Sequence, residues 1–157
     1  MIGNDIVDLA LAQQESNWQR KGFLNKIFTP KEQEFILTSP NPENMLWNLW
    51  SRKEAAYKIY NRQTSRRVFN PIQFECEADT VVIGNTIYYT QTEITSEFVY
   101  TVAVTSKNFF DEVQHFSNRE NIQKINGIPI WLNKENDSLH PVSITHHGRF
   151  YRIIVLM

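Results

Sequence analysis

The sequence of 157 residues lacks the features of secreted and membrane-spanning proteins. Its one cysteine, Cys76, cannot form an intrachain disulfide. The N-terminus lacks the basic region and apolar run of a secretory signal, and no stretch approaches the roughly 20 apolar residues that span a bilayer. We therefore expect a soluble, cytoplasmic protein with no membrane partner.

An excess of charge of either sign is also missing. Sixteen Lys and Arg stand against 17 Asp and Glu, which leaves a net charge of −1. No global field then steers the protein toward nucleic acid, so we expect no nucleic-acid partner, and any basic binding surface must be local. Internal repeats and low-complexity tracts are absent as well.

What the sequence does contain is typical of a folded domain. It is 41% hydrophobic and 13% aromatic, which argues against intrinsic disorder. The pattern changes from helix-rich to strand-rich near residue 68, and neither half has enough apolar surface for a core of its own. We predict one α+β domain over residues 1–157, in which a long central helix packs on an antiparallel sheet.

The N-terminal half is expected to hold one strand and several helices. Met1–Leu9 has the pattern of a short strand with Asp5 at or near its end, and helical material follows over residues 13–39. Thr29, Pro30 and Glu32 form the signature of a capped helix start, and that helix should end near Thr38.

The next helix should run from about Glu43 to Asn61 and be largely buried. Lys53 interrupts its apolar stripe, so either its side chain reaches the surface or the stripe borders a polar cleft there. The stripe consists of Leu46, Leu49, Trp50, Ala56, Tyr57 and Tyr60.

Short strands are expected beyond residue 68, with Gly84-Asn85 as a hairpin turn between two of them. The predicted strands are Ile72–Cys76, Val81–Ile83, Thr86–Thr92, Phe98–Thr105, Ile128–Leu132, Val142–Thr145 and Phe150–Leu156.

Glu54 and Lys58 are the first residues that could carry chemistry. Their i to i+4 spacing is that of an ordinary surface pair, worth about 0.2 to 0.5 kcal/mol. However, the pair borders the apolar stripe, where a carboxylate needs a cation, and Mg²⁺ takes one or two protein carboxylates together with waters and phosphate oxygens. Asp5 or Asp8 could complete such a site, although either could equally accept backbone hydrogen bonds in a turn.

Two further segments carry polar groups. Residues 141–150 have the pattern of a β-hairpin but also gather donors suited to phosphate, without the ligand pattern of a zinc site. The basic and aromatic run 18–26 is either a solvated helix face or a docking surface for an acidic partner. The donors are Ser143, Thr145, His146, His147 and Arg149, and the basic residues are Arg20, Lys21 and Lys26.

Together these residues resemble the 4′-phosphopantetheinyl transferase superfamily, most closely its small holo-acyl-carrier-protein synthase branch. Ile2-Gly-Asn-Asp-Ile-Val-Asp8 is similar to the family's Gly-x-Asp motif, and Trp50-Ser-Arg-Lys-Glu-Ala-Ala-Tyr-Lys58 to its Lys-Glu-Ala-x-x-Lys motif. Ile27-Phe28-Thr29-Pro30-x-Glu32 resembles the stretch between them, and Ser143-Ile-Thr-His-His-Gly148 resembles the family's Ser-x-Ser-His element. Residues 63–126 match little and form a β-rich region of open role.

The resemblance implies transfer of 4′-phosphopantetheine from coenzyme A to a serine of an apo acyl-carrier protein, with release of 3′,5′-ADP. It assigns Asp5 and Glu54 to Mg²⁺, and it makes Asp5, Glu54 and Lys58 catalytic. The groups that it assigns to the coenzyme A phosphates are Lys53, Lys58, Thr145, His146 and Arg149.

Two departures from the family pattern matter. Val7 replaces the second acidic residue of the larger members, as in the small branch, which implies a homotrimer in which His146 acts on a neighbouring subunit's site. Ile128 stands where the family often has a lysine between glycine and proline. The alternatives are a non-catalytic module of the same fold that binds a carrier protein or a nucleotide, and a structural subunit in which Glu54 and Lys58 are an ordinary pair.

Overall fold

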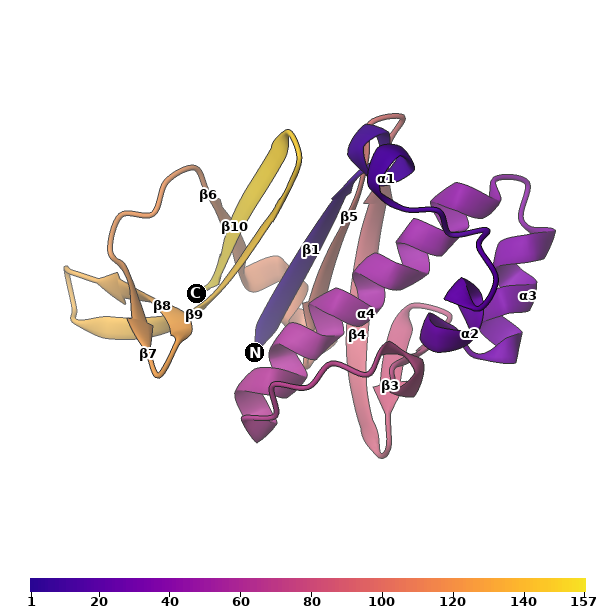
Figure 1. Ribbon diagram of the computed structural model, residues 1–157. Coiled ribbons are helices and arrows are strands. Elements are labelled where there is room, and N and C mark those ends of the chain that lie inside the picture. The colour runs from indigo at the N-terminus through magenta and orange to yellow at the C-terminus, as the bar shows by residue number, and fades with distance from the viewer.

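A computed structural model describes all of residues 1–157 (Figure 1). The first half comprises β1 (Ile2–Asp8), α1 (Leu9–Glu15), α2 (Phe23–Ile27), α3 (Pro30–Thr38) and α4 (Pro42–Thr64). The second half begins with the 3-10 helix η1 (Pro71–Gln73) and contains β2 (Glu75–Glu77), β3 (Thr80–Ile83), β4 (Thr86–Ile94), β5 (Phe98–Val104), the 3-10 helix η2 (Lys107–Glu112), β6 (Val113–Phe116), β7 (Ile122–Ile125), β8 (Ile128–Asn133), β9 (Ser138–His147) and β10 (Phe150–Leu156).

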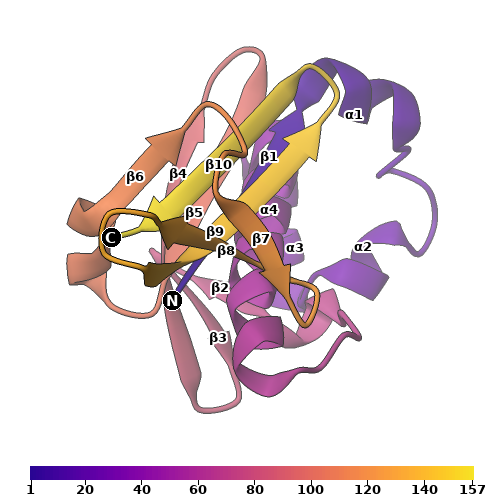
Figure 2. The same cartoon turned by 90° about the vertical axis from the view of Figure 1, so that its left-hand side faces the viewer.

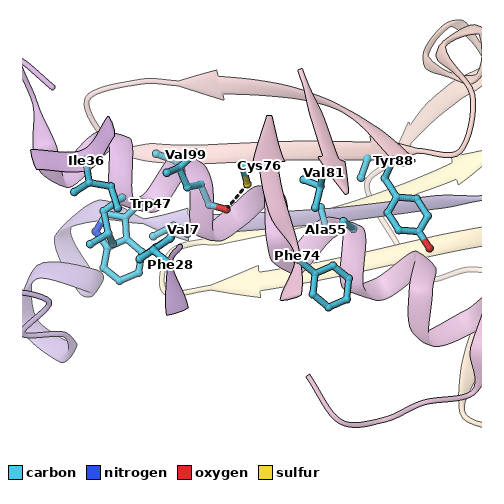
Figure 3. Close-up of a cluster of buried hydrophobic side chains, with 14 of the residues drawn as sticks. Val7, Phe28, Ile36, Trp47, Ala55, Phe74, Cys76, Val81, Tyr88 and Val99 are labelled. Carbon is cyan, nitrogen blue, oxygen red and sulfur yellow. Dashed lines mark hydrogen bonds between the residues drawn. The ribbon is translucent and has the colours of Figure 1, made fainter. Parts of the chain in front are cut away.

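The first sheet is antiparallel and has the order β1-β5-β4-β3-β2. α4 crosses one face of this sheet and packs on β1 and β5, as Figure 1 shows. The largest hydrophobic cluster lies in this layer and includes Val7, Ala55, Val81, Tyr88 and Val99 (Figure 3). The predicted α+β class, with a long helix on an antiparallel sheet, is confirmed.

The second sheet is also antiparallel, in the order β6-β10-β9-β8-β7. Figure 2 shows β9 and β10 lying over β1, and both strands pack against it. β1 is therefore enclosed by α4, β5 and the second sheet, which puts Asp5 where all three meet. Asp5 pairs with Thr101 in the middle of β1, so the expectation that it lies at a strand end is wrong.

Local sequence signals account for the helix boundaries. Thr29 and Glu32 form the predicted capping box, and α3 begins at Pro30 and ends at Thr38. α4 is capped by the Asn41 side chain, which accepts a hydrogen bond from the Asn44 backbone N–H. It ends at Thr64, because Ser65 adopts a left-handed conformation with φ 58°.

The buried face of α4 differs from the predicted stripe. Trp50, Tyr57 and Tyr60 are only partly buried, because the sheet covers one side of the helix while α3, η1 and β2 cover another. The buried residues are Leu46, Trp47, Leu49, Ser51, Arg52, Lys53, Ala55, Ala56 and Ile59.

Six of the seven strands predicted beyond residue 68 are confirmed, and the seventh is wrong in part. Gly84-Asn85 forms the expected turn between β3 and β4. The predicted strand over Ile72–Cys76 instead begins as the 3-10 helix η1, because Pro71 opens a turn there. β6 and β7 were not predicted, since both are short and largely exposed and lack a clear apolar alternation. No helix combines the length and the apolar character needed to cross a membrane.

Candidate active site

Gly3 allows β1 to lie directly against α4. A Cβ atom on Gly3 would collide with the backbone carbonyl oxygen of Ala55 and press on the Ile59 side chain. The close approach therefore needs glycine on the strand and is helped by the small Ala55 and Ala56 side chains, both fully buried on the helix. The two motifs that carry Asp5 and Glu54 are thus in direct contact through their smallest residues.

Asp5 and Glu54 line one cavity of about 430 Å³. Its walls come from β1, α1, α2, α4 and β9, so residues far apart in the sequence meet there. His146 and His147 of β9 contribute to one wall, and Phe23, Ile27, Trp47 and Trp50 give it an apolar side. The cavity therefore combines two carboxyl groups, imidazole and aromatic surface.

Burial raises the proton affinity of both carboxyl groups, and the Asp5 charge adds to this effect at Glu54. Burial, followed by the nearby Asp5 charge, raises the pKa of Glu54 to about 7, against the opposing influence of Lys58. Burial likewise raises the pKa of Asp5, and Lys58 and a hydrogen bond from Thr145 work against that rise. Two carboxyl groups held in this way bind protons or a cation more readily than free carboxylates do.

Lys58 pairs with Asp5 and not with Glu54. Its Nζ lies 3.6 Å from Asp5 Oδ1 and donates hydrogen bonds to the carbonyl oxygens of Asn4 at 2.6 Å and Ile144 at 3.4 Å. The ammonium thus bridges α4, β1 and β9. The interpretation of Glu54 and Lys58 as an ordinary helix-surface pair finds no support, because no ion pair joins them within 4.0 Å.

The family model of the 4′-phosphopantetheinyl transferase superfamily, ACPS, matches residues 1–109, which carry Asp5, Glu54 and Lys58. The chain belongs to this superfamily. A holo-[acyl-carrier-protein] synthase of Chlamydia felis (strain Fe/C-56) is 39% identical over 57 residues, which are 36% of this chain and 47% of that protein. The match thus spans about half the length of this curated relative.

Solved structures share the fold of this transferase superfamily member. The Chronobacterium ammoiniagenes apo-ACPS structure has a TM-score of 0.53 at 15% identity, covering 66% of this chain and 93% of that one. The structure of holo-[acyl-carrier-protein] synthase (AcpS) from Neisseria meningitidis has a TM-score of 0.51 at 16% identity, covering 67% of this chain and 96% of that one. The predicted phosphopantetheinyl transferase fold is confirmed, and about a third of this chain lies outside these alignments.

The donor set of this superfamily member fits a hard divalent cation. Asp5 and Glu54 would supply oxygen ligands, and no third His, Cys, Asp or Glu forms a cluster with them. Mg²⁺ is held by one or two carboxylates and completes its shell with water and phosphate oxygens, whereas zinc requires three or four protein ligands. Because the pKa of both carboxyl groups is raised, their ionised forms are unfavourable without a nearby cation, and a bound cation would stabilise them.

Lys53 does not contact the cavity, and its assignment to the coenzyme A phosphates is wrong. Its side chain is fully buried, and its Nζ donates to Glu32 Oε2 at 2.7 Å and to the carbonyl oxygens of Pro71 and Phe74 at 2.9 and 2.7 Å. All three ammonium hydrogens are thus used inside the protein. The Lys53 side chain therefore neither reaches the surface nor borders a polar cleft, and both predictions for it are wrong.

Thr145 supports Asp5 and does not face a ligand. Its Oγ1 accepts a hydrogen bond from the Ile6 backbone N–H at 3.2 Å and donates to Asp5 Oδ1 at 3.2 Å. The residue is only 5% exposed and its hydroxyl already has two partners, so the structure gives no support to its predicted contact with nucleotide phosphates. It is a positioning residue for Asp5.

Arg149 is paired with carboxylates, and its predicted phosphate contact stays a prediction. Its guanidinium makes a bidentate pair with Asp8, Nε to Oδ2 at 2.9 Å and Nη2 to Oδ1 at 3.0 Å, and reaches Glu97 at 3.2 Å. Asp8 also accepts hydrogen bonds from the Ala10 and Leu11 backbone N–H groups. Asp8 is therefore the cap of α1, as the turn interpretation proposed.

His146 and the basic run lie where a ligand could reach them. His146 is exposed on β9 and lines the cavity with Asp5 and Glu54, while His147 is engaged with the Asp8 backbone. Arg20, Lys21 and Lys26 are exposed around α2, and the Arg20 guanidinium lies 5.6 Å from the centroid of Phe23, a cavity residue.

Arg62 was not predicted as a functional residue from the sequence. Arg62 and Lys58 line a second cavity of about 210 Å³ together with Gly127 of the β7–β8 turn, Ile128 and Pro129 at the start of β8, and Ser143. Burial lowers the pKa of Arg62 to about 10, and its guanidinium contacts the Val142 carbonyl oxygen with no carboxylate partner. The available signal was its i to i+4 spacing from Lys58, which places both cations on one side of α4.

Proposed function

We propose that this protein transfers the 4′-phosphopantetheine group from coenzyme A to a serine of an apo acyl-carrier protein in a Mg²⁺-dependent reaction that releases 3′,5′-ADP. The observation that carries the proposal is the convergence of Asp5 and Glu54 in one cavity, with Lys58 beside Asp5 and left unpaired with Glu54. Two carboxyl groups and one ammonium suit a metal-dependent reaction at a pyrophosphate.

The proposed reaction is a displacement at phosphorus. The serine Oγ forms a bond to the phosphorus that carries pantetheine, and the bond from that phosphorus to the oxygen of the adenosine phosphate breaks, with 3′,5′-ADP as leaving group. Mg²⁺, held by Asp5 and Glu54, would polarise the attacked phosphorus and neutralise charge. Lys58 would stabilise the leaving phosphate oxygen, since its ammonium already reaches the junction of β1 and β9.

Glu54, or a water on the metal, would accept the serine proton. Thr145 holds the Asp5 carboxylate through a 3.2 Å hydrogen bond, so this ligand is oriented before substrate binds.

Three side chains would contact the nucleotide phosphates. His146 approaches from β9, while Lys58 and Arg62 approach from α4 beside the β7–β8 turn at Gly127. Arg62 then provides at this turn the positive charge that Ile128 cannot, because a guanidinium without a carboxylate partner is an anion site. The missing lysine at position 128 is thereby compensated.

The carrier protein is expected to dock over α2. The exposed cations Arg20, Lys21 and Lys26 suit an acidic partner, and Phe23 and Ile27 offer apolar surface at the cavity edge. The resemblance to the small branch supports assembly of three copies. We place the reaction in the cytoplasm, where the buried free thiol of Cys76 would stay reduced.

Mass spectrometry of an apo carrier protein tests this function. With coenzyme A and Mg²⁺ the wild-type protein should add one phosphopantetheine to the carrier, and Glu54→Gln should lower the rate by at least about 100-fold, because a metal ligand and proton acceptor are lost. The matched control is Glu34→Gln on the exposed face of α3, which should keep full activity.

The absence of any mass gain with several carrier proteins, under conditions where the wild-type protein is folded, would reject the transferase. Binding of a carrier or nucleotide without transfer would then support the non-catalytic module.

A further inference from the structure

The two walls of the cavity come from different parts of the chain. The family model matches residues 1–109, which hold Asp5, Glu54 and Lys58. His146 comes from β9, in the second sheet, which begins at Val113 and lies beyond the matched residues. Building on the proposed function, we infer that one chain supplies both walls, so that each copy carries a complete active site without a residue from a neighbour.

This arrangement differs from the one that the resemblance implied, in which His146 acts on a neighbouring subunit's site. Residues 113–156 therefore act as an intramolecular completion segment for the matched unit. We call them the completion sheet, because they form β6 to β10.

The outer edge of β1 is bonded to the completion sheet by side chains. The backbone N–H groups of Asn4, Ile6 and Asp8 point away from β5, and they donate to Ser143 Oγ at 2.9 Å, Thr145 Oγ1 at 3.2 Å and His147 Nδ1 at 2.8 Å. The acceptors stand at every second residue of β9, which matches the spacing of the donors on β1. The strand edge that another chain could use is thus occupied by the same chain.

The turn between β9 and β10 is shaped to fit the end of β1. Gly148 has φ 52°, and a Cβ there would press on the Asp8 carboxylate. The Arg149 backbone N–H donates to Asp8 Oδ2 at 3.0 Å, in addition to the two guanidinium bonds to Asp8. The position of β9 is therefore fixed at both its middle and its end.

An apolar cluster also joins the two sheets. Seven buried residues from β1, β5 and β10 form it, and Phe109, Phe110 and Val113 pack against it from η2 and the start of β6. The sheets thus share one core, and their connection through η2 is short. The seven residues are Ile2, Ile6, Tyr100, Val102, Val104, Ile154 and Leu156.

Coexpression of paired variants tests the inference through activity. Asp5→Asn disables the matched unit and His146→Ala disables the completion sheet, each with an expected loss of transfer. If every site belongs to one chain, the coexpressed pair gives no activity beyond the sum of the two single variants. If sites are instead shared between neighbouring chains of a ring, about a quarter of the wild-type rate should return. In a random mixture, a quarter of the sites combine a chain that keeps Asp5 with a neighbour that keeps His146.

A second coexpression gives the matching positive result. Wild-type chains mixed equally with the Asp5→Asn/His146→Ala double variant should keep about half of the wild-type rate per chain if sites are intramolecular, against about a quarter if they are shared. Recovered activity in the first mixture, together with about a quarter of the wild-type rate in the second mixture, would overturn the inference.

A readout without activity separates this inference from the proposed function. Hydrogen exchange, measured at a dilution where light scattering shows single chains, should find the amides of Asn4 and Ile6 protected. Ser143→Ala and Thr145→Val should lower that protection at the bonded amide, at least about tenfold, since each removes its acceptor. The matched control is Thr86→Val on β4, which is exposed and away from this edge.

Unprotected amides in the single chain, with protection regained on assembly, would show that β9 comes from a neighbour. Protected amides without any transfer to carrier proteins would reject the proposed function and leave the intramolecular arrangement intact. Wild-type activity in His146→Ala would remove that residue from the site, and the exchange measurement would then decide the arrangement of the strands.

Discussion

Glu54 shares a partly buried cavity with Asp5, and its pKa is raised to about 7 by burial and then by the Asp5 charge. A carboxyl group whose pKa is higher in the folded than in the unfolded state opposes folding once it ionises. Lys58 relieves this cost only in part, because it pairs with Asp5. The residues proposed to bind the metal are therefore expected to destabilise the metal-free protein.

Replacing Glu54 tests this cost directly. The penalty of the ionised carboxylate is absent below its ordinary pKa of 4.5, grows as the pH rises, and is complete above about 7. At pH 8 without metal, Glu54→Gln should raise the free energy of unfolding by about 2 to 3 kcal/mol. Denaturant titrations at pH 4 and pH 8 measure the difference, which should be small at the lower pH.

Saturating Mg²⁺ should make the wild-type protein more stable than Glu54→Gln at pH 8. The free energy of unfolding of the wild-type protein should rise with Mg²⁺ concentration, and that of Glu54→Gln should stay nearly unchanged, because a ligand stabilises only the state that binds it. Equal stabilisation of both proteins would contradict the assignment of Glu54 as a metal ligand. Glu34→Gln serves as the control for a change of net charge at an exposed site.

At the scale of secondary-structure elements, the buried pair of Lys53 and Glu32 joins α4 to three neighbours. Glu32 caps α3 through the Thr29 N–H and accepts from the Cys76 N–H of β2, while Lys53 donates to the carbonyl oxygens of Pro71 and Phe74 around η1. Every polar group of the pair has a partner, so the ions are tolerated without water. The network fixes the turn of α4 that precedes Glu54.

Breaking this pair should unfold the region around α3 and η1 more easily. Lys53→Met leaves the Glu32 carboxyl without its cation and should cost about 3 to 5 kcal/mol of stability, measured by denaturant unfolding. Glu32→Gln should cost a similar amount. The double variant should lose less than the sum of the two, and strict additivity would show that the two side chains do not interact.

At the scale of the whole molecule, Asp8 lies at the junction of three parts. It ends β1, caps α1 and pairs with Arg149 of the β9–β10 turn, and Arg149 also contacts Glu97 before β5. The side-chain hydrogen bond from Arg149 holds the pKa of Asp8 well below its ordinary value of 3.8. The charge of Asp8 thus helps to hold the completion sheet against the first sheet.

Acid should weaken this junction. Because the pKa of Asp8 is lower in the folded than in the unfolded state, its contribution is complete above 3.8 and is lost as the pH falls further. Asp8→Asn should lower the stability at pH 7, and the difference from wild type should shrink between pH 4 and pH 2. Thermal unfolding across that range measures it, and a constant difference would show that the Asp8 charge has no part in it.

Sequence patterns determined those features that depend on neighbouring residues. The capping box at Thr29, the turn at Gly84-Asn85 and the long helix α4 follow from local rules, and the structure confirms them. The carboxylates Asp5 and Glu54 were identified because their motifs resemble those of a known superfamily, and the cavity brings them together. Helix caps, turns and motif spacings depend on residues that are close in sequence, so sequence patterns are enough to predict them.

Only the tertiary structure decided which polar side chains are free to act. Lys53, Thr145 and Arg149 looked like phosphate ligands, yet each is used by a partner distant in sequence: Glu32, Asp5 and Asp8. Arg62 gained a role because Val142 and the turn at Gly127 lie beside it. The packing of α4, β1 and β9 determines which acceptor each donor meets. Contacts between residues distant in sequence cannot be predicted from local sequence patterns.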